Sequence, residues 1–258
     1  MRTPLLDHGY LEVVEHWGSD ERIIEAARMS TDKGFQGWGP NPCSCLDPDP
    51  EAMPRSQAGC PKCGGLGQVP GDEKLLRYMW EHRHSSPFEF AGLVVEVQAP
   101  IMVFREWHRH RTQSFSELSA RYTPMPNLSY VPTTERLLIN ASSTNKQAGT
   151  VAGSNVLTPG AAEEFRHQLG KLYEHAEELY QKALCAGVPK ELARLPVPVA
   201  RYSRMRASAN LRNWLAFLTL RNDAAAQWEV RQFAMGLQTL LAERFPRTLA
   251  LFAEGQAK

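Results

Sequence analysis

The densest group of polar side chains in the sequence lies between residues 105 and 122. Three arginines and two histidines fall within the seven residues 105–111, and Ser119 and Arg121 follow shortly after. Arginine is suited to binding phosphate because its planar guanidinium donates two parallel hydrogen bonds. On charge alone, however, such a run is more typical of a solvated basic helix end. The order of the residues therefore has to decide between these interpretations.

Cysteines form a second group of residues that could bind a metal ion or take part in a reaction. Cys43 and Cys45 are separated by one residue, and Cys60 and Cys63 by two, with Gly64 and Gly65 following. Close cysteine pairs followed by glycine are typical of tetrahedral zinc sites. The alternatives are a redox pair or unliganded thiols, although the second pair lacks the βαβ context of a thioredoxin-like motif. We predict a structural zinc site. Its expected ligands are Cys43, Cys45, Cys60 and Cys63.

Composition limits the classes of protein to which the chain can belong. It has 258 residues, 43% hydrophobic and 22% charged, with a net charge of +1. This is enough for one large domain with a buried core, and a near-neutral charge argues against nucleic-acid binding through bulk positive charge. No apolar run has the length of a membrane span, and no apolar stretch follows the first four residues. We expect a cytoplasmic protein with reduced thiols and no membrane or nucleic-acid partner.

The elements that position these groups are predicted from hydrophobic periodicity and breakers. Helices are expected at 20–29, 72–82, 100–110, 159–187, 211–221 and 225–245, and strands at 11–14, 88–99 and 199–203. Residues 112–122 are expected to be irregular. The predicted organisation is one domain over 1–258 of mixed α and β structure, with an inserted Cys-rich module at 38–71 and a flexible loop at 140–158. The buried stripe of the 159–187 helix is predicted to be Phe165, Leu169, Leu172, Ala176, Leu179 and Ala183.

The order of the polar residues resembles a family signature. Arg109-His110-Arg111, seven residues, then Ser119 and Arg121-Tyr122, is similar to the signature of the flavin-dependent thymidylate synthases. Short motifs match by chance, so further matching regions are needed. Three further blocks resemble that family and occur in the right order. They are residues 84–89, residues 187–194, and residues 210–221 with 226–229.

This resemblance implies a fold and a reaction. The fold would be of the α/β (α+β) type, with a mixed or antiparallel sheet flanked by long helices. The reaction would be the FAD-dependent reductive methylation of dUMP to dTMP, with methylenetetrahydrofolate as one-carbon donor and NADPH as reductant. The protein would be a homotetramer in which several subunits build each active site.

The resemblance also implies roles for individual residues. FAD would be bound by Ser86, Glu89, Arg109, His110, Arg111, Asn210 and Arg212. The nucleotide would be bound by Glu106, Glu117, Leu118, Ser119, Arg121, Arg194 and Arg221. Arg221 is the predicted catalytic residue. Because guanidinium stays protonated, its expected role is to stabilise negative charge on the uracil edge rather than to act as a base.

Two further observations bear on this interpretation. Thymidylate synthases of the other kind use a cysteine nucleophile, but Cys185 has no obvious basic partner and is interpreted as a small core residue. The sequence also departs from the family, which often has Gln, Asn and His where this chain has Glu106, Ala216 and Ala225. These departures leave open a different pyrimidine product or an altered rate.

Two other functions remain as alternatives. One is a zinc-ribbon protein that binds nucleic acid, which the neutral net charge and the spread of matching blocks argue against. The other is a flavoenzyme that uses another pyrimidine nucleotide or another one-carbon donor. No Gly-x-Gly-x-x-Gly fingerprint follows a predicted strand, so no Rossmann domain is expected for the flavin or NADPH.

Overall fold

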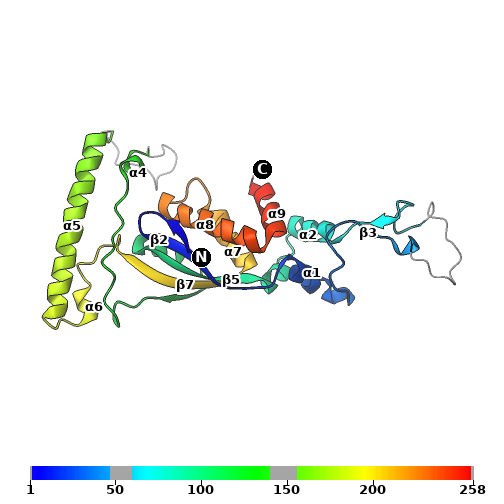
Figure 1. Ribbon diagram of the computed structural model, residues 1–258, viewed down its shortest axis with the longest axis horizontal. Helices are drawn as coiled ribbons and strands as arrows, with labels where there is room; N and C mark the ends of the chain where they lie inside the picture. The colour runs from blue at the N-terminus through cyan, green and yellow to red at the C-terminus, as the bar shows by residue number, and fades with distance from the viewer. Residues whose placement is uncertain (1, 47–59, 140–155, 257–258) are drawn as a thin grey trace. The chain divides into compact units, whose positions relative to one another are not determined.

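The computed structural model describes residues 2–46, 60–139 and 156–256 (Figure 1). Most of the predicted flexible loop, residues 140–155, and the middle of the Cys-rich module, residues 47–59, lie outside the described residues. The chain forms two compact units. The first comprises Met1–His16, Leu93–Ala209 and Asn213–Leu240, and the second comprises Trp17–Gly92, Asn210–Arg212 and Leu241–Lys258.

The described elements follow one another as a mixture of strands and helices, as predicted. The strands are β1 (Arg2–Leu5), β2 (Gly9–Trp17), β3 (Asn41–Pro42), β4 (Gln68–Val69), β5 (Gly92–Pro100), β6 (Ser114–Glu117) and β7 (Tyr202–Asn210). The α-helices are α1 (Asp20–Arg28), α2 (Asp72–Glu81), α3 (Ile101–Trp107), α4 (Thr134–Leu138), α5 (Pro159–Cys185), α6 (Lys190–Ala193), α7 (Leu211–Arg221), α8 (Trp228–Arg244) and α9 (Pro246–Gln256). Three short 3-10 helices are η1 (Met29–Thr31), η2 (Ser44–Leu46) and η4 (Ser86–Phe90).

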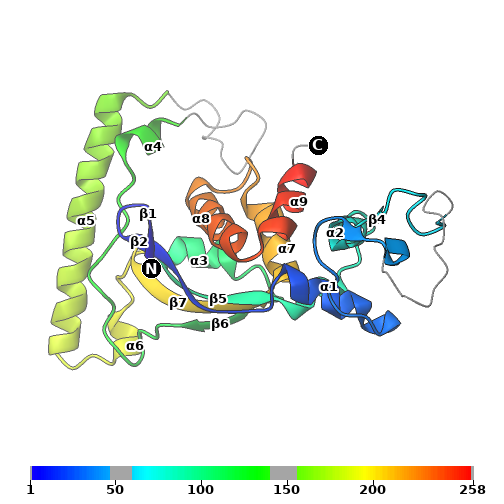
Figure 2. The same cartoon turned by 45° about the vertical axis from the view of Figure 1, so that its right-hand side comes forward.

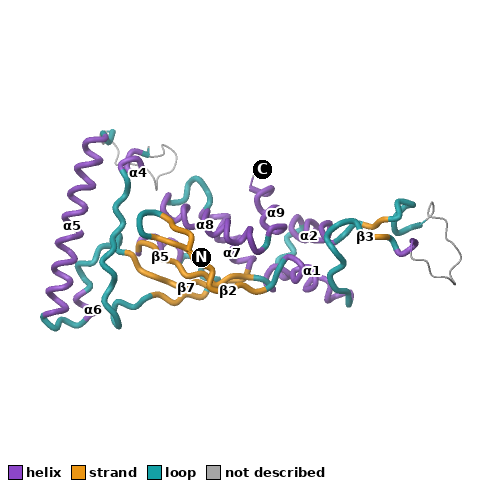
Figure 3. Tube along the Cα trace, viewed as in Figure 1, coloured by secondary structure: helices purple, strands orange, loops and turns teal. Residues whose placement is uncertain are grey.

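A five-stranded sheet with the order β1-β2-β5-β7-β6 forms the centre of the first unit (Figure 3). β1 pairs antiparallel with β2, and β6 pairs antiparallel with β7, where Ser114 lies opposite Ser208. In β5 every second side chain from Leu93 to Ala99 is fully buried, which gives the sheet one apolar face. This mixed architecture with an antiparallel sheet confirms the predicted fold class.

Helix α8 lies over the sheet (Figures 1 and 2). The two pack closely at Gly9 in β2, where an added Cβ would come within 2.9 Å of the Phe233 ring. Helices α3 and α7 contribute a second apolar group. The rings of Trp107 and Phe217 lie 4.6 Å apart, and the indole of Trp214 donates to the Leu93 carbonyl at 3.2 Å. This packing fixes the ends of α3 and α7, where the predicted site residues begin.

The second unit is built on the contact of α1 with α9. Asp20, in the first turn of α1, accepts hydrogen bonds from the amides of Arg247 and Thr248 and from the Thr248 hydroxyl. It thereby caps the first turn of α9. Burial raises the pKa of the Asp20 carboxyl, and the three hydrogen bonds oppose that rise.

Several element bounds differ from the prediction. The strand expected at 88–99 begins only at Gly92, because residues Ser86–Phe90 form a 3-10 helix with Pro87 in its first turn. The strand expected at 199–203 is instead Tyr202–Asn210. Its inward-facing positions include small residues, so the alternation of apolar and polar side chains that predicts a strand is weak in the sequence. Residues 114–117, expected to be irregular, form the polar edge strand β6, stabilised by pairing with β7 rather than by apolar side chains. Helix α9 was not predicted.

The predicted buried stripe of α5 is wrong at its largest residues. Phe165, Leu172 and Leu179 are each half exposed, with exposed fractions of 50–58%. The buried face instead carries Ala162, Ala176 and Tyr180, because α5 packs through small residues and one aromatic ring. Periodicity identified the helix but not which of its faces packs within the chain. Cys185, interpreted as a core residue, is exposed at the end of the same helix.

None of the described helices is both long and apolar enough to cross a membrane.

Candidate active site

Arg221, the last residue of α7, is held at three points by residues at the end of α3. Its Nη1 donates to Glu106 Oε2 at 2.9 Å and its Nη2 to the Glu106 carbonyl oxygen at 2.9 Å. Its Nε donates to His110 Nε2, also at 2.9 Å. The Arg221 side chain is 16% exposed. The structure therefore brings the predicted catalytic residue together with two other predicted site residues, and fixes the plane of its guanidinium.

His110 is neutral in this arrangement. Burial is the main cause that lowers its pKa to about 4, the Arg221 charge lowers it further, and the Glu106 charge opposes both. Because Nε2 accepts the hydrogen bond from Arg221, the ring proton is on Nδ1. The ring also packs against Phe217 at a centroid distance of 4.7 Å. A neutral histidine thus orients the arginine without repelling it.

Arg109 and Arg111 follow α3 in a tight turn and are exposed. The buried Trp107 fixes this turn, because its indole donates to Gln113 Oε1 at 2.9 Å. Asn213 in α7 fixes the turn a second time, donating to the Thr112 carbonyl at 3.0 Å. Gln113 and Asn213 were not among the predicted site residues. Both lie within the matching segments, but nothing in the local sequence distinguishes an amide that positions the backbone from a solvated one.

A second group, near Glu191, contains three of the predicted nucleotide-binding residues, Ser119, Arg121 and Arg194. Arg121 pairs with the Glu191 carboxylate at 3.4 Å, and Arg194 Nε donates to the Glu191 carbonyl at 3.3 Å. The Ser119 hydroxyl accepts from the Arg121 amide at 3.3 Å. Both arginines are exposed. Glu191 itself lay inside a matching block but had no predicted role.

Glu117 and Leu118 connect this group to the sheet. Glu117 is the last residue of β6, opposite Met205 in β7, and the Leu118 amide donates to the Arg204 carbonyl at 2.8 Å. The backbone at Ser119 is therefore held by strand pairing just before the nucleotide-binding group.

A third group, in the second unit, contains the other predicted flavin-binding residues. Glu89 forms an ion pair with Arg212 at the start of α7. The Leu211 amide donates to the Ala91 carbonyl at 2.7 Å, which joins the segment after η4 to the start of α7. Ser86 begins η4 and Asn210 ends β7. The motifs around residues 84–89 and 210–212, far apart in sequence, are thus neighbours.

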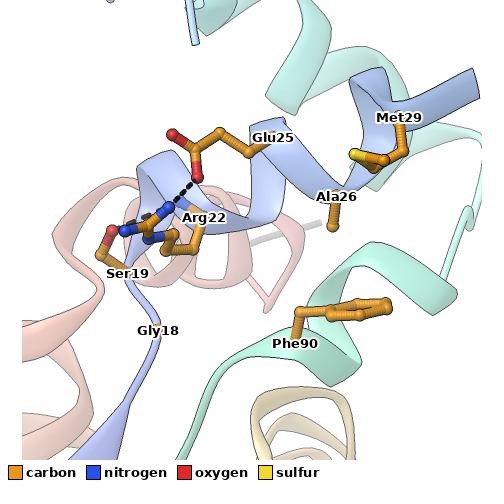
Figure 4. A pocket seen from close by; sticks show the side chains of 7 residues that line it. All are labelled: Gly18, Ser19, Arg22, Glu25, Ala26, Met29 and Phe90. Carbon is orange, nitrogen blue, oxygen red and sulfur yellow. Dashed lines mark hydrogen bonds and ion pairs between the residues drawn. The ribbon is translucent and has the colours of Figure 1, made fainter. Parts of the chain in front are cut away.

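An open pocket lies beside this third group, between α1 and Phe90 (Figure 4). Met29 and Phe90 flank it, and Arg22 pairs with Glu25 on its rim. None of the predicted site residues lines it. The residues that do so are Gly18, Ser19, Arg22, Glu25, Ala26, Met29 and Phe90.

The four predicted metal ligands also come together. One sulfur from each of Cys43, Cys45, Cys60 and Cys63 lies within 4.8 Å of the other three. The amides of Cys63 and Lys62 lower the pKa of the Cys60 thiol to about 6, whereas the neighbouring thiols, Cys43 first, raise that of Cys45 to about 12. Among the described residues this is the one group of at least three His, Cys, Asp or Glu side chains suited to holding a metal ion.

Comparison with known proteins gives a consistent result. The family model described as thymidylate synthase complementing protein matches residues 12–247. A flavin-dependent thymidylate synthase of Thermotoga neapolitana is 30% identical over 98% of this chain and 94% of its own length. Another, from Thermus thermophilus, is 32% identical over 98% of this chain and 79% of its own length.

Solved structures of similar fold include a UMP/dUMP methylase, PolB from Streptomyces cacaoi. Its complex with 5-Br UMP aligns with a TM-score of 0.73 at 29% identity, covering 97% of this chain and 96% of that one. Its complex with 5-Br dUMP aligns with a TM-score of 0.72 at 30% identity, covering 98% and 97%. This chain is therefore an enzyme that belongs to the thymidylate synthase complementing protein family, the family of the flavin-dependent thymidylate synthases.

Proposed function

We propose that the protein catalyses the FAD-dependent reductive methylation of dUMP to dTMP, with methylenetetrahydrofolate as one-carbon donor and NADPH as reductant. The observation that carries the proposal is the fixed guanidinium of Arg221, oriented by Glu106 and His110 within a motif set of this family. The names of the relatives and the dUMP analogue bound by a similar structure support the substrate class. Bound flavin would supply the hydride, and this chain would supply binding, orientation and charge.

Flavin binding is assigned to two sets of residues. Arg109 and Arg111 project from the turn after α3, where their charges suit the FAD pyrophosphate. Ser86, Glu89, Asn210 and Arg212 form the second set, and the Glu89–Arg212 pair would hold its segments in place when flavin binds. His110 serves both the flavin site and the orientation of Arg221.

The dUMP phosphate would bind at Ser119, Arg121 and Arg194. In the structure Arg121 pairs with Glu191, but both side chains are more than half exposed. An exposed ion pair contributes only about 0–1 kcal/mol, so a doubly charged phosphate can replace the carboxylate at small cost. Glu117 and Leu118 would face the nucleotide sugar from the end of β6. Ser119 would donate a hydrogen bond rather than act as a nucleophile, because its hydroxyl contacts the Arg121 amide, which cannot act as a general base.

Arg221 would bind the uracil edge. Its guanidinium stays protonated and cannot easily accept a proton. Glu106 and His110 bind three of its five N–H groups, which fixes the orientation of the remaining donors. A charge held in place before the reaction stabilises negative charge on the pyrimidine as it develops.

The oligomeric state is also part of the proposal. Phe165, Leu172 and Leu179 on α5 are half exposed and seven residues apart, so they form an apolar stripe along the helix. An exposed stripe of this kind favours association with another copy of the chain. We infer a cytoplasmic homotetramer. Light scattering on the holoenzyme should report four chains, and a monomer at assay concentration would refute this part of the proposal.

A second substrate deserves a direct test. The similar methylase structures are described as acting on UMP and dUMP, and this chain departs from the usual family residues at Glu106, Ala216 and Ala225. Methylation of UMP is therefore the second candidate function. The two nucleotides differ only at the 2′-hydroxyl, so a single assay format compares them.

The test begins with the flavin. Denatured holoenzyme should release FAD, identified by chromatography. The visible spectrum of bound flavin should change on titration with dUMP, and dTMP should form when methylenetetrahydrofolate and NADPH are added. The same titration with UMP decides between the two substrates. Absence of bound flavin after reconstitution with FAD would overturn the proposal. If the enzyme methylated UMP but not dUMP, UMP would be assigned as the substrate in place of dUMP.

A further inference from the structure

We propose that Cys43, Cys45, Cys60 and Cys63 bind one tetrahedral zinc ion, and that this ion stabilises the folded state of the described segments 38–46 and 60–71. The proposal concerns a site separate from the residues assigned to flavin and nucleotide. It rests on sulfur geometry, on the backbone that positions the sulfurs, and on the lack of a hydrophobic core among the described residues around them.

The sulfur geometry matches a single metal ion. A tetrahedral zinc site with Zn–S bonds of about 2.3 Å places neighbouring sulfurs about 3.8 Å apart. The Sγ atoms of Cys43 and Cys60 are 3.8 Å apart, and those of Cys45 and Cys63 are 3.6 Å apart. A disulfide would need a separation of about 2.05 Å. All five cysteines are free thiols.

A short hairpin brings the two cysteine pairs together. β3 and β4 pair antiparallel, with Pro42 opposite Gln68, and the Cys43 amide donates to the Gly67 carbonyl at 2.8 Å. Beyond the second pair, the Gly64 amide donates to the Cys60 carbonyl at 2.8 Å, which closes a tight turn around the sulfurs. Gly64 has φ +57°, a conformation that glycine adopts without steric cost.

Hydrophobic burial cannot hold this segment together. In the described parts of the module, residues 38–46 and 60–71, the buried hydrophobic side chains are Cys43 and Cys63 alone. Leu46 and Leu66 are exposed, the latter by 83%. Small units without an apolar core need disulfides or a metal ion. Binding of zinc to four thiolates can supply that free energy of folding directly.

The arrangement is less suited to redox chemistry. A redox pair at Cys60 and Cys63 would form its disulfide within that pair. Sulfur contacts in the structure also join Cys60 to Cys43 and Cys63 to Cys45, so that each pair contributes to both contacts and the four sulfurs form one group. Four cysteine sulfurs in a tetrahedral site are typical of zinc or iron. Zinc is the metal to which the proposal commits, and elemental analysis distinguishes the two.

Metal content is the first test. Elemental analysis of the holoenzyme should show one zinc per chain in the wild-type protein and in Cys185→Ser, which removes the exposed thiol outside the cluster. The Cys60→Ser/Cys63→Ser double variant should show none. Its flavin content and dUMP-induced spectral change should persist, which would show that the rest of the chain remains folded. Zinc that stays bound in the double variant, or iron in its place, would overturn the assignment.

A second test uses the wild-type protein, so it does not depend on the folding of a variant. With metal bound, one thiol per chain should react rapidly with a disulfide reagent. After chelation five should react, and added zinc should protect four of them again. Cobalt replacing zinc should give tetrahedral thiolate bands at wavelengths longer than flavin absorbs. Five reactive thiols in native protein that contains no metal, or a disulfide within the cluster, would refute the proposal.

Discussion

The Arg221 cluster, formed with Glu106 and His110, and the cysteine cluster are both groups of polar side chains, but different forces hold them. Arg221 follows helix positions such as Trp214, Phe217 and Leu218 that are fully or almost fully buried. Hydrophobic packing therefore holds the Arg221 cluster in place whether or not a ligand is present. The cysteine cluster has no such surroundings in the described residues. Chemistry and folding can therefore be separated by mutation at the first cluster, whereas at the second the ligand is itself the source of stability.

The largest effect is expected for Arg221→Lys. Lysine keeps the charge but loses the planar set of donors that binds Glu106 and His110. FAD should stay bound and the affinity for dUMP should fall only partly. Turnover should fall about a hundredfold or more, as when a residue that stabilises transition-state charge is removed. Single-turnover dTMP formation with pre-reduced flavin is the measurement.

Arg136→Lys is the matched control for that experiment. Arg136 is also a partly buried arginine paired with a carboxylate, that of Glu229, at 2.8 Å. It has no assigned role in the reaction, so the control should keep turnover near that of the wild-type protein. If Arg221→Lys also turned over at the wild-type rate, Arg221 would be a helix-end cation without a catalytic role.

Removal of zinc should have the next largest effect, confined to stability. Chelation should accelerate proteolytic cleavage within residues 38–46 and 60–71 by more than about tenfold, since a loss of only ~1.4 kcal/mol raises the open population by that factor. The dUMP-induced change in the flavin spectrum should remain. Mass spectrometry locates the cuts. Equal cleavage rates with and without metal would show that the cysteine cluster does not depend on a ligand.

Glu106→Gln should have a smaller effect. The amide oxygen can still accept from Arg221 Nη1, and the backbone carbonyl contact is unaffected. The Glu106 side chain is 40% exposed, so solvent screens its charge. The lost charge should cost about 1 kcal/mol, and turnover should fall less than about tenfold. In Glu106→Ala, turnover should fall further because the Arg221 Nη1 donor loses its partner. Equal rates for the two variants would show that Glu106 does not orient Arg221.

The smallest expected effect is a difference in the pH dependence of stability. The pKa of His110 falls from its ordinary 6.5 to about 4 in the native state. Between these values the unfolded chain binds a proton that the native chain does not, so stability contributed by neutral His110 is complete above pH 6.5 and is lost as pH falls toward 4. His110→Gln keeps an acceptor for Arg221 but does not titrate.

Urea unfolding of both proteins between pH 4 and 7 measures this difference. Other groups affect both proteins alike, so the wild-type protein should lose more stability than His110→Gln as the pH falls. Parallel curves would mean that His110 is protonated to the same extent in the native and unfolded states.

Local signals explain which parts could be predicted. The bounds of α7, Leu211–Arg221, were predicted correctly because an apolar periodic run is bounded by polar residues. The four cysteines could be grouped because metal sites use short spacings. The exposed stripe of α5 could not be assigned to a face, because periodicity records that a helix is amphipathic and not what covers it.

Long-range pairings left no local signal. Arg221 and His110 are 111 residues apart in sequence, and no pattern around either one indicates that they share a hydrogen bond. The pairing of Arg121 with Glu191 is of the same kind. The family motifs identified the residues of the candidate site, but only the fold shows which of these residues contact one another.

The ends of the Cys-rich module meet where the module joins α2. The Asp72 amide donates to the Gly37 carbonyl at 2.8 Å, and the buried Asp72 carboxylate accepts from the Gln36 amide at 2.6 Å and pairs with Arg28. The backbone thus leaves and returns at one place. Insertions with this geometry are exchangeable, because a replacement of different length need only begin and end at the same two residues. Residues 38–71 are accordingly a position at which a short turn, an affinity tag or a small reporter domain can be engineered while α1 and α2 stay joined through Asp72.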